Sequence, residues 1–209
     1  MMRSLIILVL LSLPLAAHAE DGSRLWLRYE PLPAAQASLV NQSLQGVHAD
    51  LSLPSLSAAI EELQRAVKGF TGRDLPIIPR LRNQSVVLVV GGSQLAKTFG
   101  LNEELAAMHR DGYIIRPMSE NRQSYIVVAS PAQVGVLYGV FHLIRSIQTA
   151  EFTPQLTVKS EPRFDVRILN HWDNLNGTVE RGYAGRSLWL WNELPNTLSP
   201  RYRDYARVN

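Results

Sequence analysis

The sequence predicts an α/β domain, in which helices are layered on a sheet, followed by the beginning of a second unit. An uninterrupted β-branched run at residues 85–90 ends in two glycines, as expected of a strand that is buried on both faces. Two apolar segments, 112–115 and 124–128, flank a polar turn and predict a hairpin. Helical patterns at residues 58–67 and 130–144 complete the argument, because strands and helices around one apolar core form a layered α/β domain.

The composition supports a folded chain and excludes several classes of protein. Of the 209 residues, 46% are hydrophobic and 19% are charged, so there is enough apolar surface to build a core. The chain has no cysteine, which excludes disulfide scaffolds, zinc–cysteine sites and thiol nucleophiles. The formal net charge is +3, and the longest basic cluster is Arg201, Arg203 and Arg207, interrupted by Asp204. A nucleic-acid binder concentrates its Lys and Arg in a run or stripe, so we expect no nucleic-acid partner.

The first 19 residues have the pattern of a signal peptide. Arg3 supplies a positive charge, residues 4–15 are almost wholly apolar, and residues 17–19, Ala-His-Ala, have the small-x-small form of a cleavage site. The apolar stretch is shorter than the about 20 residues that a membrane-spanning helix needs. We therefore expect cleavage after Ala19 and a secreted or periplasmic protein without membrane attachment. An uncleaved N-terminal anchor is the alternative.

The predicted elements of the first domain begin with a short strand. Residues 25–29 alternate large apolar and variable positions and predict a strand that ends at two prolines. Residues 34–54 are small and polar with weak periodicity, and no element is predicted there. Residues 58–67 then have helical spacing, and the helix is expected to stop at two glycines, Gly69 and Gly72.

A helix at about residues 93–99 follows the buried strand and ends at Gly100. The turn between them, Gly91-Gly92-Ser93, invites a nucleotide-binding interpretation. It lacks the third glycine and the spacing of Gly-x-Gly-x-x-Gly, so we interpret it as a sharp strand-to-helix turn.

The clearest helix begins at residue 130. Ser130 is expected as the N-cap, Pro131 at the first helical position, and Gln133 as the partner in a Ser-x-x-Gln capping box. One apolar stripe is predicted to face the core, and it consists of Val134, Leu137, Tyr138, Phe141 and Ile144. Gly135 and Gly139 lie in the helix interior, where each costs about 1 kcal/mol relative to Ala. We expect a close approach of the helix to the sheet to offset this cost.

A second unit follows a linker-like stretch at residues 159–162. The alternation of Phe164, Val166 and Ile168 with charged residues predicts a strand over 164–169. A glycine-rich loop comes next, and Ser199-Pro200 begins a helix with an apolar face. One such βα unit cannot bury its own faces. The sequence ends at Asn209 without a helix-ending pattern, so we expect it to be the leading part of a longer protein; docking of this helix on the first domain is the alternative.

Two blocks of the second unit point to a family. Residues 170–174, Asn-His-Trp-Asp-Asn, and residues 180–185, Glu-Arg-Gly-Tyr-Ala-Gly, closely resemble the α-glucuronidases of glycoside hydrolase family 67. Enzymes of this family remove 4-O-methylglucuronic acid from xylo-oligosaccharides, in xylan breakdown. The helix containing residues 135–139, Gly-Val-Leu-Tyr-Gly, looks like the α/β domain that precedes the catalytic barrel in this family and in β-hexosaminidases, and residues 25–29 are similar to the family's first strand.

The resemblance implies an N-terminal α/β accessory domain at residues 20–158, similar to the second domain of β-hexosaminidases, and the start of a (β/α)8 catalytic barrel at residues 159–209. A complete barrel takes about 250 residues, and its active site draws on the ends of several strands. The general acid and the base carboxylates of this inverting family lie on later barrel strands. No catalytic residue is therefore expected in this sequence, and we expect the 209-residue chain alone to have no hydrolase activity.

Four residues are predicted to contact the substrate, a xylo-oligosaccharide that carries glucuronic acid. Trp172 offers a flat apolar face to a sugar ring, Asp173 and Glu180 offer acceptors for sugar hydroxyls, and Arg181 offers a fork that fits a uronate carboxylate. The structural alternatives are packing of Trp172 between strand and helix, and a local ion pair between Glu180 and Arg181. No second histidine lies within four residues of His171, so no metal site is predicted, and no cofactor is implied.

Two other functions stay open on the sequence. The first domain alone fits a non-catalytic carbohydrate-binding or docking domain. A hexosaminidase has a similar accessory domain, although the Asn-His-Trp-Asp-Asn block at residues 170–174 argues against it. The sequence predicts no oligomeric state and no preference for the 4-O-methyl group.

Overall fold

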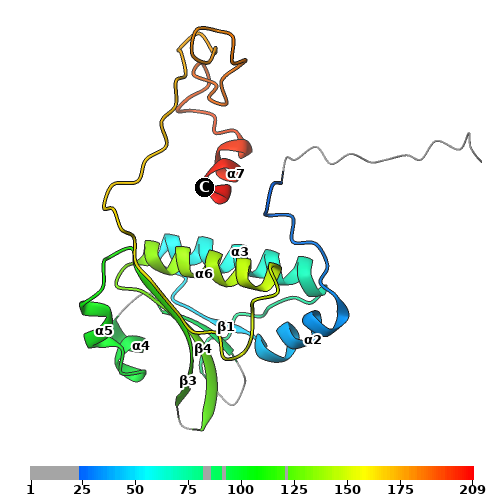
Figure 1. Cartoon of the computed structure of the whole chain (residues 1–209), viewed down its shortest axis with the longest axis vertical. Helices are drawn as coiled ribbons and strands as arrows, with labels where there is room; N and C mark the ends of the chain where they lie inside the picture. The colour runs from blue at the N-terminus through cyan, green and yellow to red at the C-terminus, as the bar shows by residue number, and fades with distance from the viewer. Residues whose placement is uncertain (1–23, 82–85, 91–92, 121) are drawn as a thin grey trace, which may run out of the picture.

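A computed structural model describes residues 24–81, 86–90, 93–120 and 122–209. The predicted signal peptide and the Gly91-Gly92 turn lie outside these ranges. In chain order, the elements are α2 (Ala34–Ser43), β1 (Val47–His48), α3 (Pro54–Thr71), β2 (Val86–Val90), α4 (Ser93–Thr98), α5 (Asn102–Ala106), β3 (Tyr113–Glu120), β4 (Gln123–Ala129), α6 (Gln133–Gln148), β5 (Val158–Ser160) and α7 (Pro200–Val208) (Figure 1).

The described strands form one five-stranded mixed sheet in the order β1-β2-β4-β3-β5. Strands β1, β2 and β4 are parallel, whereas β3 is antiparallel to both β4 and β5. The hairpin register pairs Pro117 with Ile126 and Ser119 with Ser124. The predicted strand at 85–90 and the predicted hairpin are therefore confirmed, and the domain is a mixed α/β domain.

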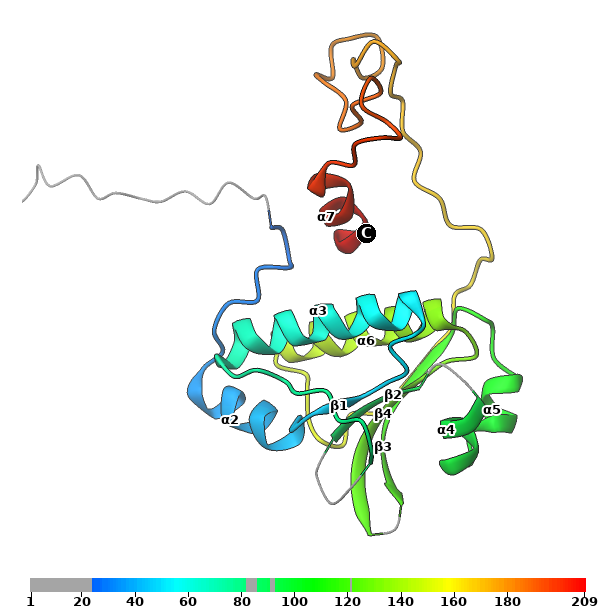
Figure 2. The ribbon, with the colours of Figure 1, turned by 180° about the vertical axis from the view of Figure 1, so that it is seen from behind.

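Helices cover both faces of this sheet. Helices α3 and α6 lie side by side across one face, and α4 and α5 lie against the other (Figure 1 and Figure 2). Successive residues of the hairpin point to opposite faces. Accordingly, Ile115, Ile126 and Val128 belong to the core under α3 and α6, and Ile114 and Val127 belong to the core under α4 and α5. None of the described helices is both long enough and apolar enough to cross a membrane.

Helix α6 packs on the sheet through two glycines, as the sequence predicts. A Cβ atom at Gly135 would lie 2.6 Å from the carbonyl oxygen of Gly112, and one at Gly139 would lie 2.7 Å from Val128 Cγ1. Both distances are too short for any side chain, so the backbone reaches this depth only where the residue is glycine. The close approach offsets the propensity cost of the two glycines.

The predicted apolar stripe of α6 is confirmed only in part: Leu137 and Phe141 are half-buried and pack against the core, but the fully buried stripe is rotated toward the neighbouring face. The prediction placed in the core Val134, Leu137, Tyr138, Phe141 and Ile144, of which only Ile144 is buried. The residues that pack inward lie on the neighbouring face, and they include Val136, Val140, Leu143, Ile144 and Ile147. Both stripes are apolar, so periodicity alone does not choose between them. The stripe next to the two glycines is buried because only that face can approach the sheet.

Helix α6 also begins later than predicted. It starts at Gln133, with Ala132 in the N-cap position and no side-chain cap. The buried Ser130 Oγ accepts a hydrogen bond from the backbone N–H of Ala132 at 3.2 Å and donates to the carbonyl oxygen of Arg110 at 3.5 Å. Ser130 therefore stabilises the turn that leads into the helix, not the first turn of the helix itself.

Two predictions near the N-terminus are also wrong. Residues 25–29 do not form a strand: residues 25–28 form turns, and the backbone has positive φ at Leu25 (45°) and at Tyr29 (53°). Leu27 and Tyr29 are buried, so the apolar alternation marks anchoring side chains and not β-structure. Helix α2 and strand β1 form in the stretch where no element was predicted.

Helix α3 confirms the predicted helix at 58–67 and extends it at both ends. Its C-cap is Gly72, which has a left-handed φ of 72°. Gly69, predicted to stop the helix, lies inside it. A Cβ atom there would lie 2.7 Å from Tyr29 Cβ, so Gly69 allows the N-terminal segment to cross closely over α3.

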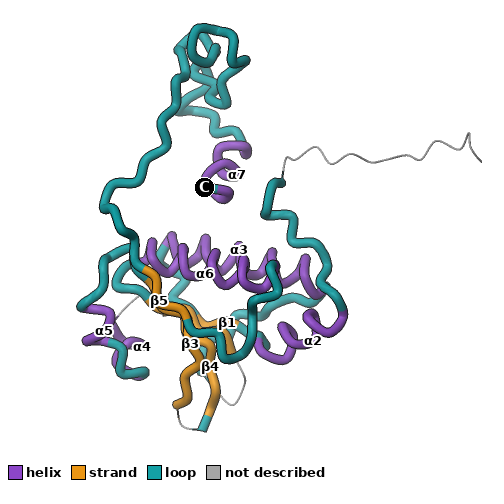
Figure 3. The backbone as a smooth tube through the Cα atoms, viewed as in Figure 1, coloured by secondary structure: helices purple, strands orange, loops and turns teal. Residues whose placement is uncertain are grey.

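The predicted strand at 164–169 is not formed. Residues 161–199 contain loops, turns and isolated bridges (Figure 3). Phe164, Val166 and Ile168 are 72%, 75% and 83% exposed. A β-ladder requires a neighbouring strand, and no described strand pairs with this segment. The predicted helix after Ser199 is present as α7, and Ser199 Oγ accepts a hydrogen bond from the backbone N–H of Arg201.

Helix α7 returns to the first domain and lies over α3 (Figure 1 and Figure 2). Glu62 of α3 is only 3% exposed and receives Arg207 of α7 in a bidentate contact, Nε to Oε2 and Nη2 to Oε1, both at 2.7 Å. The hydroxyl of Tyr29 donates to Oε1 at 2.5 Å, and Arg65 Nη1 donates to Oε2 at 2.6 Å. The indole N–H of Trp26 donates to the carbonyl oxygen of Val208 at 3.1 Å. The docking that the sequence offered as an alternative therefore exists.

The contacts of Glu62 decide its charge. Burial alone would raise the pKa of Glu62, but hydrogen bonds from Arg207 and Tyr29 and the charges of Arg207 and Arg65 outweigh it and hold this pKa below its usual value. Burial and the hydrogen bond to the carboxylate raise the pKa of Tyr29. The hydrogen bond to Glu62 raises the pKa of Arg207. The folded chain thus favours an ionised carboxylate between protonated partners.

The substitution Gly139→Ala tests the packing of α6. We expect it to lower the free energy of unfolding by about 1–3 kcal/mol, as overpacking does, although Ala is the better helix former. In a denaturant titration, combining it with Val128→Ala should cost less than the sum of the two single changes, because Val128 supplies the clashing atom. A Gly139→Ala variant that gains stability would contradict the close approach.

The Glu62 cluster should make the fold sensitive to acid. The folded-state pKa is held below the unfolded value of about 4.3, so the contribution of Glu62 is complete above that value and is lost as the pH falls through the lower, folded pKa. Thermal unfolding measured from pH 7 to pH 2 should therefore depend less on pH in Glu62→Gln than in the wild type. Glu61→Gln, an exposed position on the same helix, is the control and should follow the wild type. Parallel curves for all three proteins would contradict the assignment.

Candidate functional site

The candidate site is the 170–189 loop, which lies between β5 and α7 and away from the sheet (Figure 3). Asn174 organises its centre: the side-chain Nδ2 donates to Thr178 Oγ1 at 3.0 Å and to the carbonyl oxygen of Glu180 at 2.5 Å. The backbone N–H of Glu180 donates to the carbonyl oxygen of Trp172 at 2.7 Å. The two blocks that the sequence singles out are therefore brought together.

The second block, residues 180–185, contains tight turns that change the direction of the chain. Gly182 and Gly185 have φ values of 94° and 90°, which residues with a Cβ atom rarely adopt. Glu180 itself has a φ of 53° without being glycine. Such positions cost free energy and are concentrated at functional sites. The backbone N–H of Val179 closes the turn by donating to the carbonyl oxygen of Gly185 at 3.1 Å.

The four predicted contact residues differ in their surroundings. Trp172 is 63% exposed, so it is not packed between a strand and a helix, which was its structural alternative. Asp173 is directed inward, and its Oδ2 lies 3.5 Å from His171 Nδ1. Glu180 is half-buried, and its Oε2 has no hydrogen-bond partner among the described residues. Arg181 is exposed and, among the described side chains, forms no ion pair with Glu180.

These surroundings leave three groups able to contact a ligand. Trp172 presents an accessible aromatic face, and Arg181 presents a guanidinium fork suited to a planar carboxylate. The buried, unpartnered Glu180 Oε2 costs about 1–3 kcal/mol until a donor reaches it, so it is a natural acceptor for a hydroxyl. The Tyr183 hydroxyl bonds to the same carboxylate, which raises the pKa of Tyr183.

An aromatic cluster that the sequence did not predict supports the loop from α7. The ring of Trp189 lies 4.8 Å from that of Tyr202 and 5.6 Å from that of His171, between centroids. Tyr205 Oη lies 3.0 Å from His171 Nε2, and the hydroxyl of Tyr202 accepts from the backbone N–H of Leu190 at 2.7 Å. The sequence predicted only that the helix beginning at Ser199-Pro200 has an apolar face, which these two tyrosines help to form. Their i, i+3 spacing was the available indication that they act together.

The described residues contain no group of three or more His, Asp or Glu side chains placed to hold a metal ion. His171 is instead held between Asp173 and Tyr205. Its two ring nitrogens thus face partners on opposite sides, which fixes the orientation of this exposed ring.

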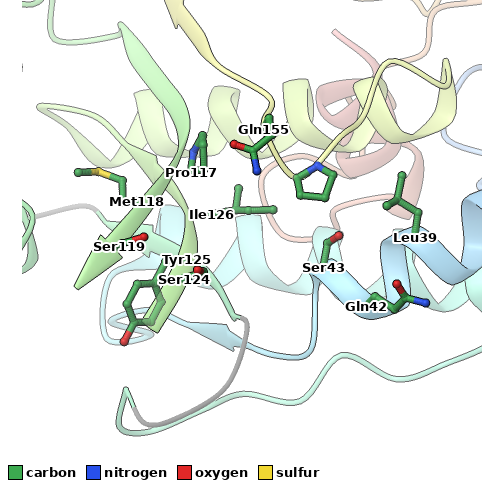
Figure 4. A pocket seen from close by; sticks show the side chains of 11 residues that line it. Leu39, Gln42, Ser43, Pro117, Met118, Ser119, Ser124, Tyr125, Ile126 and Gln155 are labelled. Carbon is green, nitrogen blue, oxygen red and sulfur yellow. The ribbon is translucent and has the colours of Figure 1, made fainter. Parts of the chain in front are cut away.

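A second concave site lies at the far end of the first domain (Figure 4). A cavity of about 560 Å³ is bounded by α2, by the distal half of the β3–β4 hairpin and by the connection from α6 to β5. The cross-strand pairs Pro117–Ile126 and Ser119–Ser124 form one wall, and Gln155 lies above it. None of the described residues that line the cavity is charged. Its lining therefore combines apolar surface with hydroxyl and amide groups.

Comparison with known proteins covers both parts of the chain. Residues 25–143 match the Glycosyl hydrolase family 67 N-terminus, and residues 146–209 match the Glycosyl hydrolase family 67 middle domain. A probable alpha-glucuronidase A of Aspergillus terreus is 29% identical over 195 residues, which are 91% of this chain and 22% of that protein. The alpha-glucuronidase A of Emericella nidulans is 29% identical over 218 residues, 99% of this chain and 25% of the relative.

The chain thus spans about a quarter or less of the length of these curated relatives. Among solved structures, a GH138 enzyme targeting pectin rhamnogalacturonan II aligns with a TM-score of 0.36 and 14% identity, over 58% of this chain and 12% of that one. This likeness is too low to support an inference. The two family matches together run through both the α/β domain and the candidate loop, and the chain therefore belongs to glycosyl hydrolase family 67.

Proposed function

We propose that this chain is the N-terminal part of an α-glucuronidase that hydrolyses the α-1,2 link between (4-O-methyl)glucuronic acid and xylose in xylo-oligosaccharides. Membership of family 67 and relatives named alpha-glucuronidase support the proposal. The single observation that carries it is the backbone hydrogen bond from Glu180 to Trp172. It joins the block that contains the exposed Trp172 ring to the block in which Glu180 Oε2 has no hydrogen-bond partner among the described residues.

In this proposal, the 170–189 loop forms one rim of the sugar site. Trp172 stacks against a pyranose ring, and Glu180 accepts a hydroxyl hydrogen bond. Arg181 binds the uronate carboxylate through two parallel N–H···O bonds. Asp173 has a lesser role than the sequence suggested, because it already faces His171.

Catalysis requires carboxyl groups that the 170–189 loop alone does not supply. Inverting hydrolysis needs an acid and a base carboxyl group about 6.5–9.5 Å apart on opposite sides of the scissile bond. The resemblance to family 67 implies that these groups lie on later strands of a (β/α)8 barrel. Residues 159–209 would form the beginning of that barrel. The exposed apolar alternation at Phe164, Val166 and Ile168 suits pairing with such strands. We therefore propose that the 209-residue chain alone is inactive.

The same proposal includes the location of the protein and the nature of its first domain. Residues 1–19 have the pattern of a signal peptide, which supports secretion or a periplasmic location. The layered α/β domain would serve as the accessory domain, with a fold akin to the second domain of β-hexosaminidases.

A second candidate function is non-catalytic binding of neutral carbohydrate by the first domain. The uncharged cavity beside the β3–β4 hairpin favours it, because its volume of about 560 Å³ falls in the range of small-molecule sites, about 300–1,000 Å³. Ser119, Ser124 and Gln155 would bond to sugar hydroxyls, and Pro117 would provide an apolar surface.

A calorimetric titration with two matched ligands tests both functions. The ligands are aldotetraouronic acid, in which a xylotriose carries 4-O-methylglucuronic acid, and xylotriose itself. If the loop binds the uronate, the acid should bind more tightly, and Arg181→Ala should weaken its binding about tenfold or more, because a charge-assisted hydrogen bond contributes about 1.5–3 kcal/mol. Arg203→Ala, an exposed arginine on α7, should change nothing.

The same titration separates the second function. If the cavity binds neutral sugar, both ligands should bind equally, and Gln155→Ala should weaken both while Arg181→Ala weakens neither. Binding of neither ligand would overturn both functions. Release of 4-O-methylglucuronic acid by the 209-residue chain would overturn the proposed inactivity.

A further inference from the structure

We propose that α7 is a two-ended bridge through which the first domain holds the 170–189 loop in position, with Glu62 and Arg207 as positioning residues. This gives the α/β domain a role in the site that neither the family matches nor the names of the relatives assign. The bridge itself is a property of the chain without ligand. Only its consequence for sugar binding rests on the proposed function.

The first end of the bridge is the Glu62 cluster. Arg207 makes two hydrogen bonds of 2.7 Å to a carboxylate that is 3% exposed. A buried charge requires partners, and removal of one partner is far more costly than loss of an exposed ion pair. Trp26 and Val208 add a hydrogen bond and apolar packing next to it. This end is therefore strongly fixed to α3.

The second end is the aromatic cluster. Tyr202 contacts Trp189 and Tyr205 contacts His171. Side chains from the beginning and from the end of the 170–189 loop therefore pack against α7. Helical geometry separates the two ends. At 3.6 residues per turn, Tyr202 and Tyr205 share one face, whereas Arg207 lies on nearly the opposite face. A single short helix can therefore contact the loop with one face and α3 with the other.

The other connection to the loop is weaker. The segment that leaves β5 is held by two ion pairs that each have one exposed partner, Arg167 Nη2 to Asp111 Oδ2 at 2.8 Å and His109 Nε2 to Asp165 Oδ1 at 3.1 Å. The backbone N–H of His109 also donates to Glu161 Oε2 at 2.8 Å. Exposed ion pairs contribute about 0–1 kcal/mol each. Figure 1 and Figure 2 show the loop standing clear of the domain between this segment and α7. The position of the loop thus depends chiefly on the α7 end.

Amide hydrogen exchange followed by mass spectrometry tests the bridge on the full 209-residue chain. In Arg207→Ala, the loop amides that are hydrogen-bonded in the wild type, including those of Glu180 and Val179, should exchange at least tenfold faster. Amides of β3 and β4 should keep their protection and serve as the internal control for folding. Arg207→Lys should restore protection only in part, because lysine lacks the bidentate fork. Arg203→Ala should match the wild type.

Unchanged exchange in the loop of Arg207→Ala would overturn the bridge, since α7 would then be released without consequence. Glu62→Gln should reproduce the effect of Arg207→Ala, and the double variant should add little to either. If the wild type binds aldotetraouronic acid, Arg207→Ala should weaken that binding although the hydrogen bonds of the Arg207 guanidinium go to Glu62 and Asp204 and not to the loop. If neither the wild type nor any variant binds the sugar but the exchange results are as expected, the proposed function is wrong and the proposed bridge is still supported.

Discussion

The buried carboxylate of Glu62 is the interaction on which the arrangement of this chain depends. It receives hydrogen bonds from Tyr29, Arg65 and Arg207, which lie in the N-terminal segment, in α3 and in α7. A charge in this position is tolerated only while its partners stay in place. Burial of one side chain thereby ties the two ends of the described chain to its central helix. The position of the 170–189 loop depends on this interaction, because α7 connects the loop to Glu62.

Much of the first domain could be predicted because its local patterns and its tertiary packing agree. The β-branched run, the hairpin and the two long helices all formed. The failures have physical reasons. Helix α6 carries apolar residues on two neighbouring faces, and only the depth allowed by Gly135 and Gly139 selects the buried one. Leu25 and Tyr29 belong to an apolar alternation that is typical of a strand, but both residues have a positive φ. The pattern of side chains does not indicate this backbone conformation.

The candidate site could be located from the sequence but not built from it. The blocks that contain Trp172 and Glu180 were identified, and the structure places them side by side. The contributions of Tyr205 and Arg207 were not foreseen, because their partners His171 and Glu62 lie 34 and 145 residues away in the chain. The strand predicted at 164–169 failed for a related reason: alternation describes a strand that has neighbours, and the described residues offer it none. Long-range partners decided these points.

The distance between α3 and the 170–189 loop is the most direct measure of whether α7 fixes the site. The chain has no cysteine, so spin labels can be attached uniquely at Lys68→Cys on α3 and Leu175→Cys in the loop, both exposed positions. Pulsed electron resonance should give one narrow distance distribution, and adding Arg207→Ala should broaden it. A distribution that is already broad without that change, or one that stays narrow with it, would contradict the account.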